Sequence, residues 1–158
     1  MMPEEEQQDG YVFDQTVSEQ REDWLTDQLV AFNLAHSTAL PGEHVEAAPL
    51  HVYALDRAGA VLGGIVGRTH AIPAWFEISV IWVDERLRHQ GLGRRLIEQA
   101  EQEASRRGCR YVRLATSNFQ APAFYQKLGY TLYGTLENCP PGETVFYFWK
   151  QLGPAVPD

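Results

Sequence analysis

Two glycines and two arginines stand together in the segment from Arg88 to Arg94, which reads RHQGLGR. A strand-like segment precedes it, and a segment with helical spacing of apolar residues follows it. Free backbone N–H groups in the first turn of a helix bind phosphate, and glycines let those groups approach a pyrophosphate without a Cβ in the way. Arg88 and Arg94 would add charge at the rim. The segment predicts a phosphate-binding turn, and a glycine-rich helix entrance without a ligand is the alternative.

Two common phosphate-binding motifs do not fit this turn. A Walker loop requires Lys and then Ser or Thr after its last glycine, but Gly93 is followed by Arg94 and Arg95. A dinucleotide-binding fingerprint requires a third glycine three residues further on, and Leu96 occupies that place. The pattern that remains is Arg/Gln-x-x-Gly-x-Gly/Ala after a strand.

A second motif follows at residues 118–130, which read NFQAPAFYQKLGY. Asn118, Ala121 and Tyr125 have the spacing Asn-x-x-Ala-x-x-x-Tyr, and Lys-Leu-Gly-Tyr closes the motif. Both motifs fall in a predicted order of strand, helix, strand and helix. Together they resemble the motifs of the GCN5-related N-acetyltransferase (GNAT) superfamily, over roughly residues 50–150.

The resemblance implies a fold in which the fourth and fifth strands run parallel and then separate, with acyl-CoA in the wedge between them. It implies that the pantetheine arm pairs with the backbone of the fourth strand and that the pyrophosphate lies on the amides of the phosphate-binding turn. Asn118 would meet the pantetheine from the other side, although a turn or cap residue is the alternative for it. The residues expected to bind acetyl-CoA, the cosubstrate, are Ile81, Trp82, Val83, Arg88, His89, Gln90, Gly91, Leu92, Gly93, Arg94 and Asn118.

The resemblance also implies two catalytic side chains. Tyr125 stands at the family's general-acid position, and an ordinary phenol keeps its proton at pH 7, as a proton donor must. Glu77 has the spacing of a general-base glutamate, and strand alternation is expected to place Glu77, Ser79 and Ile81 on one face. The alternative for Tyr125 is a packed aromatic. Glu77 could instead occupy a solvated strand position or form an ion pair with Arg68. In that case a water chain would act as the base.

The histidines and cysteines predict neither a metal site nor a disulfide, because none stand at ligand spacing. His70 could line the acceptor cleft or lie on the surface. Cys109 follows an expected helix stop at Gly108 and is predicted to be a buried small residue rather than a nucleophile.

Apolar periodicity and turn signals predict the elements that position these groups. The predicted strands are residues 11–17, 49–55, 60–70, 75–83, 110–116, 130–136 and 144–152, and the predicted helices follow a cap at Ser18, span 91–107 and span 121–128. Gly63, Gly64 and Gly67 are expected to mark a bulge or close packing. The order predicts one α/β GNAT-like (acyl-CoA N-acyltransferase) domain over residues 11–152, with a mixed sheet flanked by helices, an acidic tail at 1–10 and a second tail at 153–158.

The chain of 158 residues carries 13 basic and 21 acidic residues, a formal net charge of −8. Residues 1–56 hold twelve acids and one base, whereas residues 86–113 hold eight of the bases. This balance disfavours nucleic acid as a partner. No apolar run reaches the roughly 18 residues of a membrane span, and no signal-peptide pattern is present, so we expect a cytoplasmic protein.

These observations predict an acetyl-CoA-dependent N-acetyltransferase that moves the acetyl group directly to a primary amine in a ternary complex. A small cationic amine or a lysine-type acceptor is favoured by acidic and aromatic residues in the first third of the chain: Asp23, Trp24, Asp27, Glu43 and Glu46. A non-catalytic acyl-CoA-binding or sensing module of the same fold is the alternative. The aromatic run at residues 145–149 could also pack against a second subunit in a homodimer.

Overall fold

The structure is a computed structural model that describes residues 11–37, 47–71 and 74–153. The chain divides into two compact units, Met1–Gly42 and Glu43–Asp158, and each is treated by itself. None of the helices in the described residues is long and apolar enough to cross a membrane.

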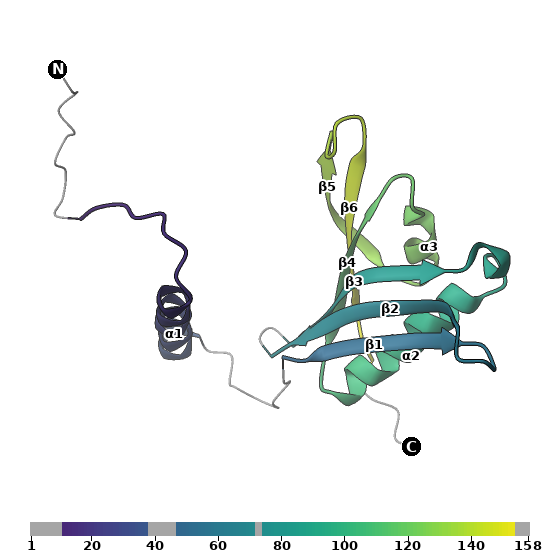
Figure 1. Cartoon of the computed structure of the whole chain (residues 1–158), viewed down its shortest axis with the longest axis horizontal. Helices are drawn as coiled ribbons and strands as arrows, with labels where there is room; N and C mark the ends of the chain where they lie inside the picture. The colour runs from purple at the N-terminus through teal and green to yellow at the C-terminus, as the bar shows by residue number, and fades with distance from the viewer. Residues whose placement is uncertain (1–10, 38–46, 72–73, 154–158) are drawn as a thin grey trace. The chain divides into compact units, whose positions relative to one another are not determined.

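The first unit contains one helix, α1, which spans Glu19–His36 (Figure 1). Ser18 caps it as predicted, since its hydroxyl accepts a hydrogen bond of 3.3 Å from the backbone N–H of Arg21. No residue of α1 is buried, and its apolar side chains, among them Trp24 and Phe32, are exposed.

The predicted strand at residues 11–17 is wrong, because the structure has no strand there. Asp14 folds the segment locally instead. Its Oδ1 accepts hydrogen bonds from the backbone N–H and the hydroxyl of Thr16, at 2.9 and 2.6 Å, and its carboxylate also pairs with Arg21. Short polar side chains that bind nearby backbone compete with strand pairing. The strand propensity of the apolar residues at the start of this segment was therefore outweighed by local polar contacts.

The second unit is built on a six-stranded sheet in the order β1-β2-β3-β4-β6-β5 (Figure 1). The strands are β1 Pro49–Leu55, β2 Val61–His70, β3 Trp75–Val83, β4 Tyr111–Ser117, β5 Thr131–Glu137 and β6 Thr144–Gln151. β3 and β4 run parallel, and every other pair of neighbours is antiparallel. The predicted mixed sheet is confirmed. Its parallel pair, expected as the fourth and fifth strands, is the third and fourth because residues 11–17 form no strand.

Two helices and a short 3-10 turn accompany this sheet: α2 Leu92–Arg106, α3 Pro122–Lys127 and η1 Glu85–Leu87. α2 packs on β1, β2 and β3, and it buries the stripe of Leu96, Ile97, Ala100 and Ala104 (Figure 1). Gly108 ends α2 with a positive φ of 89°, a conformation that glycine adopts without strain.

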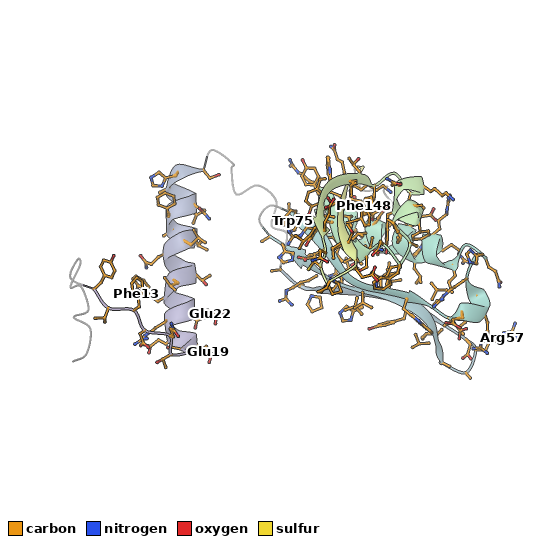
Figure 2. All side chains as sticks on the ribbon, turned by 90° about the horizontal axis from the view of Figure 1, so that it is seen from above. Phe13, Glu19, Glu22, Arg57, Trp75 and Phe148 are labelled. Carbon is orange, nitrogen blue, oxygen red and sulfur yellow. The ribbon has the colours of Figure 1, made fainter. Side chains whose placement is uncertain are left out.

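The core of the second unit lies between this helix layer and the sheet. Its largest fully buried side chains are Phe76, Phe148, Leu50, Ile65, Ile97, Val112 and Thr69. Phe148 lies amid the crowded side chains of the second unit (Figure 2).

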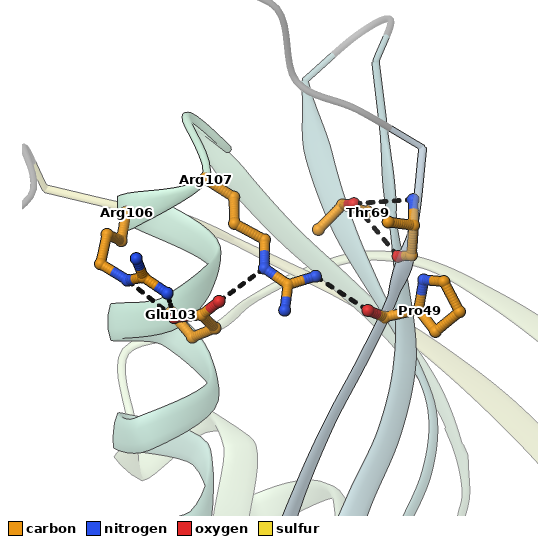
Figure 3. A network of polar contacts seen from close by, with 6 residues as sticks. Pro49, Thr69, Glu103, Arg106 and Arg107 are labelled. Atoms are coloured by element: carbon orange, nitrogen blue, oxygen red, sulfur yellow. Dashed lines mark hydrogen bonds and ion pairs between the residues drawn. The ribbon is translucent and has the colours of Figure 1, made fainter.

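Polar contacts fix the end of α2 to the start of β1 (Figure 3). Arg107 Nη1 donates to the backbone oxygen of Pro49 at 2.8 Å, and its Nε donates to Glu103 at 2.6 Å. Glu103 also accepts from Arg106, so one carboxylate orients both arginines. The helix is thereby held against the sheet at its C-terminal end.

The three glycines of β2 mark close packing, as predicted. A Cβ at Gly63 would lie 2.9 Å from the backbone oxygen of Trp82, and one at Gly64 would lie 2.8 Å from the ring of Tyr53. At Gly67 a Cβ would lie 2.5 Å from Phe76 Cε2 and would also collide with the backbone oxygen of Glu77. These positions admit no side chain without moving a strand or a ring.

Gly67→Ala should therefore lower the free energy of unfolding by about 2–3 kcal/mol, because the added methyl forces β2 away from β3. Gly134→Ala in β5 is the control, since its Cβ would meet only Tyr147 Cδ2 at an ordinary 4.0 Å. Urea denaturation of both variants checks this. Equal stability of the two variants would contradict the packing described for β2.

Candidate functional site

The parallel strands β3 and β4 separate after a short stretch of pairing. Their ladder runs from Trp75 and Tyr111 to Ile78 and Leu114 and then stops. β3 continues to Val83 paired with β2 on its other side, and β4 continues paired with β6. The edge of β3 that faces β4 is thus left without a partner strand over residues 79–83, and a wedge opens there.

A β-bulge lies at the start of this unpaired stretch. Val66 of β2 pairs with Val80, but the next residue, Gly67, pairs with Ile78, so Ser79 is the extra residue of β3. A bulge interrupts the ladder locally and increases the twist of the strand. The backbone of β3 is therefore irregular at the mouth of the wedge.

The bulge changes which side chains of β3 face the core. Ile78 is buried in the core before it, whereas Ile81 and Val83 pack against the same core after it. Regular alternation would have put the even-numbered residues on one side throughout. The expected grouping of Glu77, Ser79 and Ile81 on one face is therefore wrong, because the extra residue reverses the alternation.

The predicted phosphate-binding turn connects the end of β3 to α2. Asp84 begins η1 by accepting from the backbone N–H and the side chain of Arg86, and the guanidinium of Arg86 lowers the pKa of Asp84 to about 2. Arg88 Nε donates to the backbone oxygen of Val83 at 3.2 Å. Gln90 donates back to the oxygen of Arg86 at 2.8 Å. The turn is thus ordered by its own side chains.

Six successive backbone N–H groups, those of residues 89–94, have no acceptor among the described residues. The first helical bond of α2 runs from Arg95 to the oxygen of Gly91. Gly91 caps α2 with φ 84° and no side-chain hydrogen bond, and His89 has a positive φ of 61°. No acidic residue stands in the first turn of α2. This is the arrangement that the helix dipole and free amides require for binding an anion.

The start of α2 lies against both β3 and α3. A Cβ on Gly93 would lie 3.2 Å from Phe124 Cζ and 3.8 Å from Val83 Cγ2. The open amides are therefore next to the end of the unpaired strand and to the helix that carries Tyr125.

Tyr125 is buried at 5% exposure among three aromatic rings, those of Phe124, Tyr130 and Phe148. Burial raises the pKa of Tyr125 to about 12, because a phenolate is poorly solvated there. Its hydroxyl has no hydrogen-bond partner in the described part of the chain. A phenol in this setting keeps its proton through the physiological range.

A partly buried polar cluster lies next to Tyr125. Tyr130 donates from its hydroxyl to Glu101 at 2.8 Å, and Lys150 Nζ pairs with the same carboxylate at 2.7 Å. The backbone N–H of Tyr130 also donates to the oxygen of Tyr125 at 3.1 Å. Burial, with the neighbouring Glu101, raises the pKa of Tyr130 well above its ordinary value. The cluster ties α3, α2 and β6 together around the Tyr125 ring.

Asn118 joins the end of β4 to the start of β6. Its Oδ1 accepts from the backbone N–H of Thr144 at 3.1 Å, and its own N–H donates to the oxygen of Thr144 at 2.9 Å. The residue is exposed at the end of β4, where the strand leaves the wedge. Its side-chain oxygen thus has a structural partner.

Glu77 is held by two basic side chains from the neighbouring strands. Its Oε2 accepts from Arg113 Nη2 at 2.7 Å and lies 3.2 Å from His70 Nε2. The Arg113 guanidinium also stacks over the ring of Trp75, with 3.6 Å from Cζ to the ring centroid. Arg68, the partner considered from the sequence, lies in register with Glu77, but the ion pair forms with Arg113.

The sequence model of the acetyltransferase (GNAT) family matches residues 11–130. The chain belongs to this family. It is 41% identical over 112 residues to the blasticidin-S acetyltransferase of Streptomyces morookaense, which covers 68% of this chain and 81% of that protein.

Solved structures agree with this GNAT assignment. An acetyltransferase from Bacillus cereus has a TM-score of 0.75 and 28% identity, covering 89% of this chain and 98% of that one. A Bacillus anthracis protein assigned as a streptothricin acetyltransferase, solved with acetyl coenzyme A, has a TM-score of 0.60 and 27% identity. The match covers 67% of this chain and 64% of that one.

Two features of this GNAT site were not found from the sequence. The bulge at Ser79 leaves no compositional signal, because it exists only in the register between β2 and β3. The pairing of Glu77 with Arg113 depends on the register of two strands that are far apart in the chain. A charged residue inside each of two otherwise apolar strands was the only available hint.

The two cysteines of this GNAT chain should differ sharply in reactivity. Cys109 is buried, and burial raises the pKa of its thiol to about 11, whereas Cys139 is exposed. Because the thiolate is the reactive form, a thiol reagent should label one cysteine in the native protein. Cys139→Ser should abolish native labelling, and Cys109→Ala should preserve it. Rapid labelling of native Cys139→Ser would contradict the inert role of Cys109.

Proposed function

We propose that this acetyltransferase is acetyl-CoA-dependent and moves the acetyl group to a primary amine by direct transfer in a ternary complex. The observation that carries the proposal is the run of six open amides at residues 89–94, placed beside the unpaired edge of β3. The turn has no acidic side chain in the helix start, and two glycines give it a surface without Cβ atoms at those positions. It suits the diphosphate of coenzyme A.

The residues of the wedge fit the rest of that molecule. The free edge of β3, at the backbone of Ile81, Trp82 and Val83, can pair with an extended amide-containing chain as a strand would. Asn118 stands at the opposite side of the opening. Arg88 and Arg94 lie at the rim of the turn. Acetyl-CoA, when bound, supplies the activated acyl group, and this chain supplies the orientation.

We assign proton transfer to two side chains. Tyr125 is a protonated phenol that can give its proton to the leaving sulfur. Glu77 is the group proposed to accept the proton of the acceptor ammonium, because its Oε1 has no partner among the described residues. Backbone groups at the Ser79 bulge can stabilise the negative charge that develops on the acyl oxygen.

The acceptor is proposed to be a small molecule with a primary amine. Support comes from the similarity over most of the chain to a blasticidin-S acetyltransferase, and from a solved relative assigned to streptothricin. A lysine-type amine presents the same reacting group. Both would enter from the face of the sheet that carries Glu77.

Two substitutions of Arg94 should distinguish the contribution of its backbone amide to coenzyme A binding from the contribution of its charged side chain. Arg94 stands in the first turn of α2, where proline is tolerated because the N–H has no helical acceptor. Arg94→Ala keeps the amide and should weaken coenzyme A binding only a few-fold. Arg94→Pro removes the amide as well and should weaken it by a further factor of about ten. Calorimetric titration measures both, with circular dichroism as the folding control. Equal Kd values for the two variants would contradict a role for this amide.

Tyr125→Phe should lower kcat by about a hundredfold while the Kd for coenzyme A stays within about twofold, because only the donated proton is lost. Since the pKa of Tyr125 is about 12, the wild-type enzyme should show no loss of rate from this group up to pH 10. Thiol release from acetyl-CoA measures the rate. Unchanged turnover in Tyr125→Phe would remove Tyr125 from the chemistry, and absence of turnover in wild type would favour a sensing module.

A further inference from the structure

One row of residues across the sheet concentrates basic side chains beside the wedge. Arg68 of β2, Glu77 of β3 and Arg113 of β4 are direct partners in register. All three lie on the face of the sheet opposite α2, since their neighbours Thr69, Phe76 and Val112 are buried on the other side. A single carboxylate therefore stands between two arginines.

Only one of these arginines is neutralised. The carboxylate of Glu77 pairs with Arg113, whose guanidinium is further fixed on the ring of Trp75. Arg68 is exposed and has neither an ion pair nor a side-chain hydrogen bond among the described residues. His70 Nε2 lies 3.2 Å from Glu77 Oε2, the same oxygen that Arg113 binds. The two arginines and the one carboxylate of this row thus leave a net charge of about +1.

This excess positive charge lies close to the proposed transfer site. The row is one residue before the point where β3 and β4 part and two residues before the bulge at Ser79. At roughly 3.3 Å per residue, Arg68 starts about 7 Å from the bulge along the strand direction. A guanidinium on a flexible side chain can reach a group a few bonds from the reacting amine.

We propose that Arg68 binds a carboxylate of the acceptor, so that the acceptor is an amine that also carries a carboxylate. The proposal rests on the proposed function and narrows its substrate class. A guanidinium presents a planar fork that matches a carboxylate with two parallel hydrogen bonds. A purely cationic acceptor would instead face Arg68 unpaired. The amine of such an acceptor would point along β3 toward the bulge.

The test measures kcat/KM for matched acceptors by release of coenzyme A thiol. The acceptors are linear amino acids from glycine to aminohexanoate, each with its carboxamide and with the simple amine of the same length. For the chain length that fits, we expect wild type to prefer the carboxylate over the carboxamide by about tenfold or more. Arg68→Gln should bring this ratio close to one, and Arg68→Glu should invert it.

Arg57→Gln is the matched control, because it removes the same charge from an exposed arginine in the β1–β2 turn. Arg57 lies at the end of the sheet away from Trp75 (Figure 2). It should leave the carboxylate preference unchanged. Arg68→Lys keeps the charge but loses the fork, and it should retain only part of the preference. Thermal melting confirms that each variant is folded.

The outcomes separate the two proposals. Turnover of simple amines or carboxamides as fast as carboxylates in wild type overturns the role of Arg68 and leaves the N-acetyltransferase proposal standing. The role of Arg68 is also overturned if Arg68→Gln and Arg57→Gln show the same preference for the carboxylate over the carboxamide. Release of coenzyme A with none of the amines, although acetyl-CoA binds, overturns both.

Discussion

The site depends on one constraint: β3 and β4 share a ladder of only four residue pairs. Each strand then follows its other neighbour, β3 staying with β2 up to Val83 and β4 with β6 up to Ser117. The sheet is in effect two three-stranded sheets joined at residues 75–78 and 111–114. The bulge at Ser79 adds twist where the shared ladder ends. Backbone hydrogen-bonding groups that would be satisfied in a regular sheet are left open in the wedge, and that opening is what a strand-like ligand can fill.

The two halves carry different parts of the proposed site because different helices accompany them. α2 lies on β1, β2 and β3, so its first turn reaches the end of β3 and presents the open amides there. Tyr125 of α3 packs on Phe148 of β6, in the other half. The ion pair of Glu101 and Lys150 joins the two halves across the core, and its desolvation is offset by the hydroxyl of Tyr130. The distance between the proposed anion-binding turn and the phenol of Tyr125 is therefore set by core packing rather than by loops.

The sequence predicted the elements well where local signals are strong. The stripe from Leu96 to Ala104, the stop at Gly108 and the cap at Ser18 all follow from short-range physics, and the structure confirms them. The predicted strand at residues 11–17 is wrong, because the local hydrogen bonds of Asp14 outweighed the strand propensity of the apolar residues before it. The register between strands that are far apart in the chain could not be predicted from the sequence. The side-chain reversal at Ser79 and the partnership of Glu77 with Arg113 exist only once β2, β3 and β4 are aligned.

The net charge of the whole chain and the charge of the residue row beside the wedge have opposite signs. The chain is acidic overall, with a net charge of −8. Exposed charges farther apart than about 8–10 Å are largely screened at physiological ionic strength, so the net charge of the chain does not decide which groups bind at the site. Close to the wedge the balance is reversed, since the row of Arg68, Glu77 and Arg113 retains one uncompensated guanidinium. The carboxylate of the proposed acceptor would compensate this guanidinium locally, whatever the sign of the net charge of the chain.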